Sequence, residues 1–162
     1  MAMTLSSPAF PPGGTIPRIY TCDGRNTSPP LVWKGVPGRT GALLVLCEDP
    51  DAPRGVFHHW VAFDLPPTLD GLPEGAGSGA AGAPSALRQA VNDFGRPGYG
   101  GPCPPPGDRP HRYRFRLLAL DHALGTAVTA RAPRCAEVIA LAQPLVIAAA
   151  ELVGLYGRSP GG

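Results

Sequence analysis

Charged side chains are scarce in this chain. Asp, Glu, Lys and Arg together make up 16% of the 162 residues, and Lys34 stands alone against thirteen arginines. Because the formal net charge is only +2, we expect no electrostatic binding to nucleic acid. Arg112, Arg114 and Arg116 form a basic row with a spacing of two, and we interpret this row as the solvated face of a strand.

Long apolar runs and an export signal are also missing. No run reaches the length of a membrane span, and residues 1–12 have neither a basic start nor an apolar stretch before their prolines. We therefore expect a soluble, cytoplasmic protein. The cysteines form no C-x-x-C pair, so we expect small buried hydrophobic residues rather than a zinc site or a redox dithiol. They are Cys22, Cys47, Cys103 and Cys135.

Glycine and proline are abundant instead, with 22 of each spread between short apolar runs. This pattern is typical of a loop-rich, mostly β protein, and the length fits a single domain over residues 1–162. We predict an edge strand or strand pair at 15–20, strands at 31–33, 42–47, 56–65, 111–121 and 155–156, a loose connection at 71–84, a helical turn within 85–94, and helices at 134–142 and 144–153.

Titratable side chains are concentrated in one short stretch of this apolar sequence. Asp49 and Asp51 lie on a proline-containing turn after the apolar run, and His58 and His59 follow, all within eleven positions. Because alternate residues of a strand point to opposite faces, His59 should point inward among hydrophobic residues. His58 should then point to the opposite side of the sheet.

A second patch, residues 98–113, supplies the partners. The loop 98–107 is rich in glycine and proline, so it should form a stiff wall, made by Gly100, Gly101 and Pro102, with exposed backbone N–H groups. In the strand that follows, the same alternation places His111 and Tyr113 on the apolar face. We expect the two patches to face each other.

An acid, two imidazoles and a phenol around one shallow pocket favour a phosphate-sized anion. Binding through imidazole charge should strengthen as the pH falls towards the ordinary histidine pKa of about 6.5. Two alternatives stay open. His59, His111 and Asp49 could form a metal site with two histidines and one carboxylate, as in a metal-dependent hydrolase, or all these residues could have structural roles in turns and core.

Four ordered segments resemble the phosphatidylethanolamine-binding protein family, also called Raf kinase inhibitor proteins. They are Asp49-Pro50-Asp51-Ala52-Pro53, His58-His59-Trp60, Gly98-Tyr99-Gly100-Gly101-Pro102-Cys103-Pro104-Pro105 and His111-Arg112-Tyr113. The short gap between the first two segments is similar to the bacterial and archaeal branch. The resemblance implies a β-sandwich around a large antiparallel sheet, here with one or two C-terminal helices, and a pocket for phosphate or phosphorylated head groups.

The resemblance also implies which residues form the ligand site. The family's anion-binding positions fall on Asp49, His59, His111 and Tyr113, and the residues expected to complete or support the pocket are Pro53, Gly100, Gly101, Pro102, Asp51 and His58. We therefore expect a non-enzymatic protein without a cofactor or metal, which binds a phosphate-type anion or a phospholipid head group. It is also a candidate regulator or inhibitor of a kinase or protease, and a homodimer is compatible with the sequence.

Overall fold

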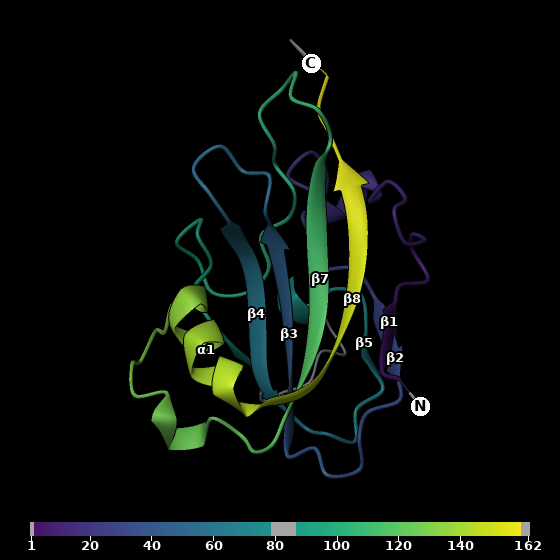
Figure 1. Ribbon diagram of the computed structural model, residues 1–162. Coiled ribbons are helices and arrows are strands. Elements are labelled where there is room, and N and C mark those ends of the chain that lie inside the picture. Colours follow the sequence, from purple (N-terminus) through teal and green to yellow (C-terminus); the bar gives the residue numbers. More distant parts are fainter. Residues whose placement is uncertain (1, 79–86, 160–162) are drawn as a thin grey trace.

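Two antiparallel sheets and one α-helix make up the fold in the computed structural model, which describes residues 2–78 and 87–159 (Figure 1). The large sheet has the order β6-β4-β3-β7-β8, from β6 (Arg88–Gln89), β4 (Phe57–Leu65), β3 (Ala42–Asp49), β7 (His111–Leu120) and β8 (Val146–Tyr156). The small sheet has the order β1-β2-β5, from β1 (Thr4–Ser6), β2 (Leu31–Lys34) and β5 (Gly71–Leu72). The helix α1 spans Cys135–Ala142, and short 3₁₀ helices lie at Arg18–Tyr20, Ala76–Ser78, Gly125–Ala127 and Gln143–Leu145.

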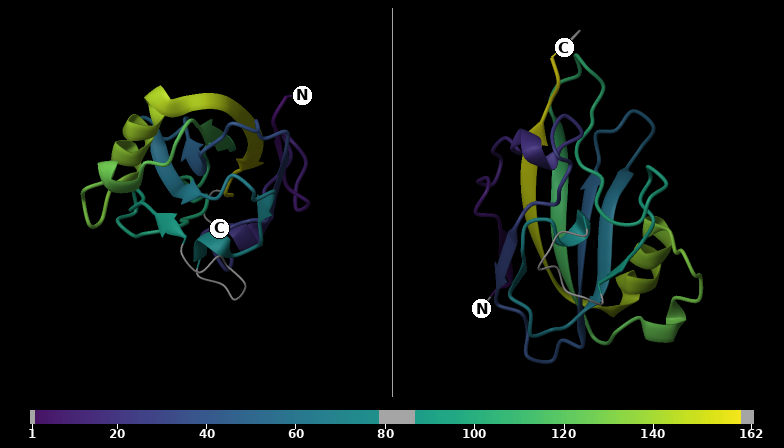
Figure 2. Two further views of the ribbon diagram at one scale, coloured as in Figure 1. Left: turned by 90° about the horizontal axis from the view of Figure 1, so that it is seen from below. Right: turned by 180° about the vertical axis from the view of Figure 1, so that it is seen from behind.

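Strand β3 lies at the centre of the large sheet and is buried on both faces. Leu43 and Val45 point into a core shared with the small sheet, whereas Leu44 and Leu46 belong to a second core that includes α1. Figure 2 shows the small sheet and α1 on opposite sides of the large sheet. A strand between two layers needs a continuous apolar run, so the strand predicted at 42–47 is confirmed and continues to Asp49.

The strand predictions at 31–33, 56–65 and 111–121 are confirmed by β2, β4 and β7. Along β7, Tyr113 and Phe115 are fully buried in the core between the sheets. The arginine row lies on the other face, where Arg112 is exposed and Arg114 forms ion pairs with Glu48 and Glu151. The basic row is therefore a solvated sheet face, as predicted.

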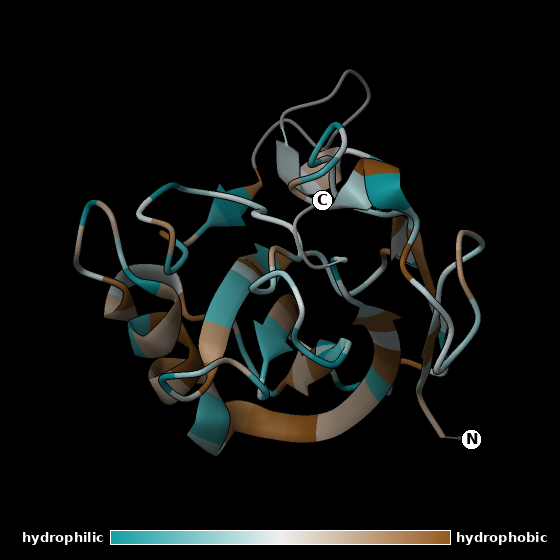
Figure 3. Cartoon of the chain, turned by 90° about the horizontal axis from the view of Figure 1, so that it is seen from above, coloured by the Kyte–Doolittle hydropathy of each residue, from teal (hydrophilic) through white to brown (hydrophobic). Residues whose placement is uncertain are grey.

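The helix predicted at 144–153 is wrong, because this segment belongs to the long strand β8. Pro144 lies in a 3₁₀ turn that ends the helical region after α1, and the chain then pairs with β7 from Leu120↔Val146 to His111↔Tyr156. The predicted strand at 155–156 is the end of β8. Figure 3 shows hydrophobic residues along much of β8. Pairing with the open edge of β7 overrides a weak helical pattern in this alanine-rich segment.

One C-terminal helix is therefore present in the described residues, α1 at Cys135–Ala142, where the helix at 134–142 was predicted. No helix within residues 2–78 and 87–159 is long and apolar enough to cross a membrane.

Two further secondary-structure predictions need correction. The edge strand expected at 15–20 is reduced to a single bridge between Thr15 and Leu155, because Pro17 fixes the backbone at the start of the 3₁₀ helix Arg18–Tyr20. The helical turn expected within 85–94 is replaced, in its described part, by strand β6, which pairs with β4. The connection at 71–84 forms β5 and a 3₁₀ turn up to residue 78, and its remainder lies outside the described residues.

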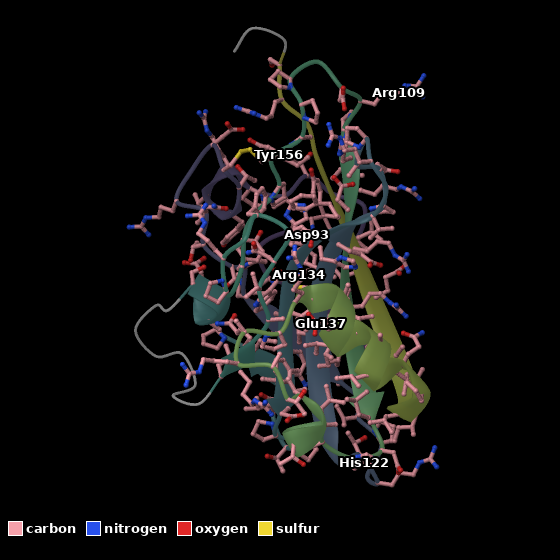
Figure 4. All side chains as sticks on the ribbon, turned by 90° about the vertical axis from the view of Figure 1, so that its left-hand side faces the viewer. Asp93, Arg109, His122, Arg134, Glu137 and Tyr156 are labelled. Carbon is pink, nitrogen blue, oxygen red and sulfur yellow. A yellow bond between two sulfur atoms is a disulfide. The ribbon has the colours of Figure 1, made fainter. Side chains whose placement is uncertain are left out.

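The prediction for the cysteines is correct for two of them and wrong for the other two. Cys47 and Cys135 are free and fully buried, but Cys22 and Cys103 form a disulfide between positions 81 residues apart (Figure 4). This bond joins the loop after the first 3₁₀ helix to the proline-rich loop. So large a separation has no local sequence signature, which explains why spacing alone did not reveal it.

Candidate functional site

A pocket of about 200 Å³ lies at the end of the large sheet where β3 stops and β4 and β7 begin. Antiparallel neighbours place the C-terminal end of β3 beside the N-terminal ends of β4 and β7, so residues far apart in the sequence meet here. The lining residues comprise five from the sequence prediction and several apolar neighbours: Asp49, Pro53, His59, His111 and Tyr113, with Ala52, Phe57, Phe94, Cys103, Pro104 and Pro105.

His111 lies between two carboxylates. Its Nδ1 is 2.7 Å from Oδ2 of Asp49, and its Nε2 is 3.1 Å from Oδ2 of Asp108. Burial opposes protonation of the ring, but the hydrogen bonds and charges of Asp49 and Asp108 outweigh it and raise the pKa of His111 above its ordinary value. The protonated ring can donate to both carboxylates at once, and in that form His111 places a positive charge beside buried Asp49.

The pKa of His59 is shifted in the opposite direction from that of His111. Its side chain is buried, and Nδ1 donates to the carbonyl oxygen of Gly100 at 2.6 Å. Burial lowers the pKa of His59, against the hydrogen bond to Gly100 and the charge of Asp49. Because a carbonyl only accepts, Nδ1 holds the proton in the neutral ring, and Nε2 is then a hydrogen-bond acceptor. The pKa values of the two pocket histidines are therefore shifted in opposite directions, which the sequence did not predict.

Tyr113 carries a polar group without a partner. The side chain is fully buried, and its hydroxyl makes no hydrogen bond of ordinary geometry within residues 2–78 and 87–159, although the carboxylate of Asp49 lies near enough to act on it. The phenol ring packs edge-on against His59, with the ring centres 5.4 Å apart. Burial and the charge of Asp49 raise the pKa of Tyr113, so the hydroxyl stays a donor. A buried hydroxyl that lines a pocket and lacks a partner points to a ligand or water there.

Asp51 has a structural role, as the sequence indicated. Its carboxylate accepts from the backbone N of Arg112 at 2.8 Å and from the guanidinium at 3.0 and 2.8 Å. Hydrogen bonds from Arg112 lower the pKa of Asp51 to about 2. The backbone N of Asp51 in turn donates to Oδ1 of Asp49 at 2.8 Å. Asp51 thus fixes the acidic turn to β7 and holds the Asp49 carboxylate towards His111.

The backbone N–H groups of Gly100 and Gly101 were predicted to be exposed to a ligand, but both donate to other parts of the protein. Gly100 donates its N–H to the carbonyl of His59 at 3.0 Å, and Gly101 donates its N–H to Oδ1 of Asn26 at 2.7 Å. Pro102 has no N–H, and its carbonyl accepts from the backbone N of Cys22. These backbone groups therefore hold the loop in place beside His59. The residues of this loop that line the pocket are Cys103, Pro104 and Pro105.

The remaining histidines lie outside the pocket. His58 points to the opposite side of the sheet, as predicted, and its Nδ1 is 3.2 Å from Oδ2 of Asp93. Exposed His122 lies at the far end of the molecule from Arg109, which precedes β7 (Figure 4). The supporting role expected for His58 is therefore limited to positioning the Asp93 loop.

Sequence reasoning missed Asp108 and Phe94. Asp108 lies in an exposed turn after Gly107, and its only sequence signal is its position three residues before His111. Phe94 packs against both Phe57 and His59, with ring centres 4.7 and 5.3 Å apart. It belongs to a segment that the sequence placed in a helical turn.

The geometry does not favour the metal alternative. Within the described ranges 2–78 and 87–159, no three His, Cys, Asp or Glu side chains are grouped so that they could hold a metal ion. The Nδ1 atoms of His59 and His111 are both engaged by protein oxygens.

Comparison with known proteins gives a consistent result. Residues 6–157 match the family model described as phosphatidylethanolamine-binding protein. The chain is 46% identical to a UPF0098 protein of Methanothermobacter thermautotrophicus, over 96% of this chain and 99% of the relative. It is 40% identical to a UPF0098 protein of Aquifex aeolicus, over 96% of this chain and 89% of the relative.

Two crystal structures have the same fold. The CT736 protein of Chlamydia trachomatis, described as a homologue of the phosphatidylethanolamine-binding protein, aligns with a TM-score of 0.84 and 36% identity over 98% of this chain and 99% of its own. YbcL of E. coli, described as a member of the mammalian PEBP family, aligns with a TM-score of 0.87 and 33% identity over 98% of this chain and 100% of its own.

Proposed function

The chain belongs to the phosphatidylethanolamine-binding protein family, and from this premise we propose that it is a non-enzymatic protein whose pocket binds a phosphate-type anion or a phosphorylated head group. The observation that carries the proposal is Tyr113, which lines the pocket beside His59 and His111 and whose buried hydroxyl has no hydrogen-bond partner among the described residues. A cavity of about 200 Å³ suits a head group rather than a large ligand.

The proposed site has few charged groups, so which anions bind depends on whether the anion or Nε2 of His59 carries a proton. His111, when protonated, balances the charge of Asp49, and His59 in its neutral form offers an acceptor at Nε2. A phosphate that carries one proton can donate its P–O–H group to this acceptor while it receives a hydrogen bond from Tyr113. A fully ionised anion such as sulfate needs His59 to be protonated first.

This difference predicts how anion binding depends on pH. Since burial lowers the pKa of His59 below 6.5, sulfate affinity should rise as the pH falls from 8 to 5.5, whereas phosphate should bind over the whole range. Replacing His59 with alanine should weaken phosphate binding roughly 10- to 100-fold, because a hydrogen bond to a charged group contributes about 1.5–3 kcal/mol. Isothermal titration calorimetry with inorganic phosphate, phosphorylethanolamine and sulfate measures all three effects.

His122→Ala is the matched control for this titration, because it removes an exposed histidine at the far end of the molecule. It should bind phosphate as the wild type does. Equal affinities for the wild type and His59→Ala would rule out the proposed role of His59.

Asp108 should compete with the bound anion. Its carboxylate occupies Nε2 of His111 and is 43% exposed, so an anion that approaches His111 meets a negative charge of the protein itself. We expect Asp108→Ala to bind inorganic phosphate about 3- to 10-fold more tightly at low ionic strength, because like-charge repulsion at a partly exposed site is of the order of 1 kcal/mol. The same titration, with exposed Asp70→Ala as the control, measures the gain. Weaker binding by Asp108→Ala would show that Asp108 supports the site instead.

Regulation of a kinase or protease through the pocket rim is a further proposal, supported by the family resemblance alone. A cytoplasmic location, a homodimer and independence from cofactors likewise stay predictions. A pull-down with the wild type and Tyr113→Phe as baits tests the protein partner, because a partner that recognises the pocket should be lost from the variant.

A further inference from the structure

A second and larger cleft, of about 490 Å³, shares the lining residue Phe94 with the pocket. Its polar lining comes from four separate segments of the chain, which the disulfide and the proline-rich loop bring together: Arg25, Asn26, Ser78, Gln89, Asn92 and Arg96. No acidic residue is among the described residues that line it. The formal charge of this lining is therefore +2.

The hydrogen-bond acceptors of the lining are already engaged by the protein. Oδ1 of Asn26 accepts from the backbone N of Gly101 at 2.7 Å, and Oε1 of Gln89 accepts from the indole N–H of Trp60 at 2.7 Å. Oδ1 of Asn92 accepts from the backbone N of Phe94 at 2.9 Å. Because each partner is an N–H donor, the orientation of all three side-chain amides is fixed, with oxygen towards the protein.

The groups left for a ligand are donors. The side-chain NH₂ groups of Asn26 and Gln89 and the guanidinium groups of Arg25 and Arg96 have no hydrogen bond or ion pair within residues 2–78 and 87–159. The hydroxyl of Ser78 accepts from the backbone N of Ser28 at 3.0 Å, and its own hydrogen is not used there. A lining of hydrogen-bond donors and two positive charges favours anions. It disfavours cations and neutral molecules that have few hydrogen-bond acceptors.

We propose that this cleft is a second ligand site, which binds a small organic phosphate through Arg25 and Arg96. Two guanidinium groups without a carboxylate match the two negative charges of a phosphomonoester, and the planar fork of arginine pairs with phosphate oxygens in a bidentate way. The volume lies in the range of small-molecule sites and exceeds that of inorganic phosphate. Phe94, Pro97 and Tyr99 supply apolar surface for the organic part. The site is independent of the function proposed for the pocket.

The test is a calorimetric titration at pH 8 with glycerol 3-phosphate, glucose 6-phosphate and adenosine monophosphate. Glycerol, glucose and adenosine serve as the uncharged counterparts. We expect at least one of the phosphates to bind, its uncharged counterpart to bind at least 10-fold more weakly, and the variant Arg25→Gln/Arg96→Gln to lose at least 10-fold in affinity.

The matched control is Arg39→Gln/Arg131→Gln, which removes two exposed positive charges elsewhere and should change the affinity less than twofold. An equal loss in both double variants would mean general charge attraction and would overturn the proposal. If Tyr113→Phe lost affinity for the phosphate and Arg25→Gln/Arg96→Gln did not, the phosphate would bind in the pocket. That result would also overturn the proposal. The proposal is also overturned if none of the three phosphates binds to the wild type.

Discussion

Removing the Cys22–Cys103 disulfide is expected to lower the free energy of unfolding by about 2–4 kcal/mol. The bond joins positions 81 residues apart, so it restricts a long loop in the unfolded chain. For a protein of this size the loss corresponds to a fall in melting temperature of roughly 5–15 °C. Urea and thermal unfolding of the wild type, with and without dithiothreitol, and of Cys22→Ser/Cys103→Ser measure the effect.

The double serine variant also supplies the control for the reductant. Cys47 and Cys135 are buried thiols that form no disulfide in the described structure, so dithiothreitol should leave the unfolding curve of the variant unchanged. Identical curves for oxidised and reduced wild type would contradict the prediction.

The same disulfide is relevant to the cellular compartment of the protein. Disulfides persist mainly in oxidising compartments, whereas the cytoplasmic location was predicted from the absence of an export signal in residues 1–12. Alkylation and mass spectrometry of the protein from its native cells would show which state Cys22 and Cys103 have there.

Replacing Asp49 with alanine should destabilise the protein by about 3–5 kcal/mol at pH 5.5, because it removes the buried partner of the charged His111 imidazole and leaves only the exposed Asp108 carboxylate. Asp49 and His111 are 4% and 5% exposed and 2.7 Å apart. The acceptor for the backbone N of Asp51 is lost as well. Chemical denaturation at several pH values measures the change.

The loss should depend on pH in a defined direction. The pKa of His111 is raised in the folded protein, so its interaction with Asp49 stabilises fully below about pH 6.5 and is lost as the pH rises through the folded pKa. At pH 8.5 the cost of Asp49→Ala should therefore fall to about 1–2 kcal/mol, from the unpaired polar groups. Neutral His59, with its lowered pKa, changes stability in the opposite direction, but it is present in both proteins and largely cancels from the difference.

Asp49→Asn separates charge from hydrogen bonding, since asparagine keeps an acceptor but not the charge. It should cost less than alanine at every pH and show a weaker dependence on pH. A destabilisation by Asp49→Ala that is the same at pH 5.5 and pH 8.5 would mean that the charge of His111 has no part in it.

Strand alternation was sufficient to predict much of the pocket. It placed His59 and Tyr113 inward and His58 outward from the period of two alone, and the structure has them so. The central position of β3 followed from its apolar run. These features depend on local sequence and on which face of a strand is buried, and both can be read directly from the chain.

Contacts over long distances in the sequence were beyond local patterns. The pairing of β8 with β7 decides the structure of 146–156, although its alanine-rich sequence also fits a helix. The disulfide and the Asp108–His111 contact depend on how loops meet in space. The opposite pKa shifts of His59 and His111 arise from burial and from two carboxylates, and residue types alone do not reveal them.

The hydrogen bond between Asp49 and His111 joins residues 62 positions apart, along the ladder between β3 and β7. Such contacts form slowly during folding, because a long loop must close before they can form. We therefore expect this end of the ladder between β3 and β7, and the pocket with it, to be unformed in the folding transition state. A ligand of the pocket would then leave the folding rate unchanged and would act by slowing unfolding, so that its benefit is a longer lifetime of the native state.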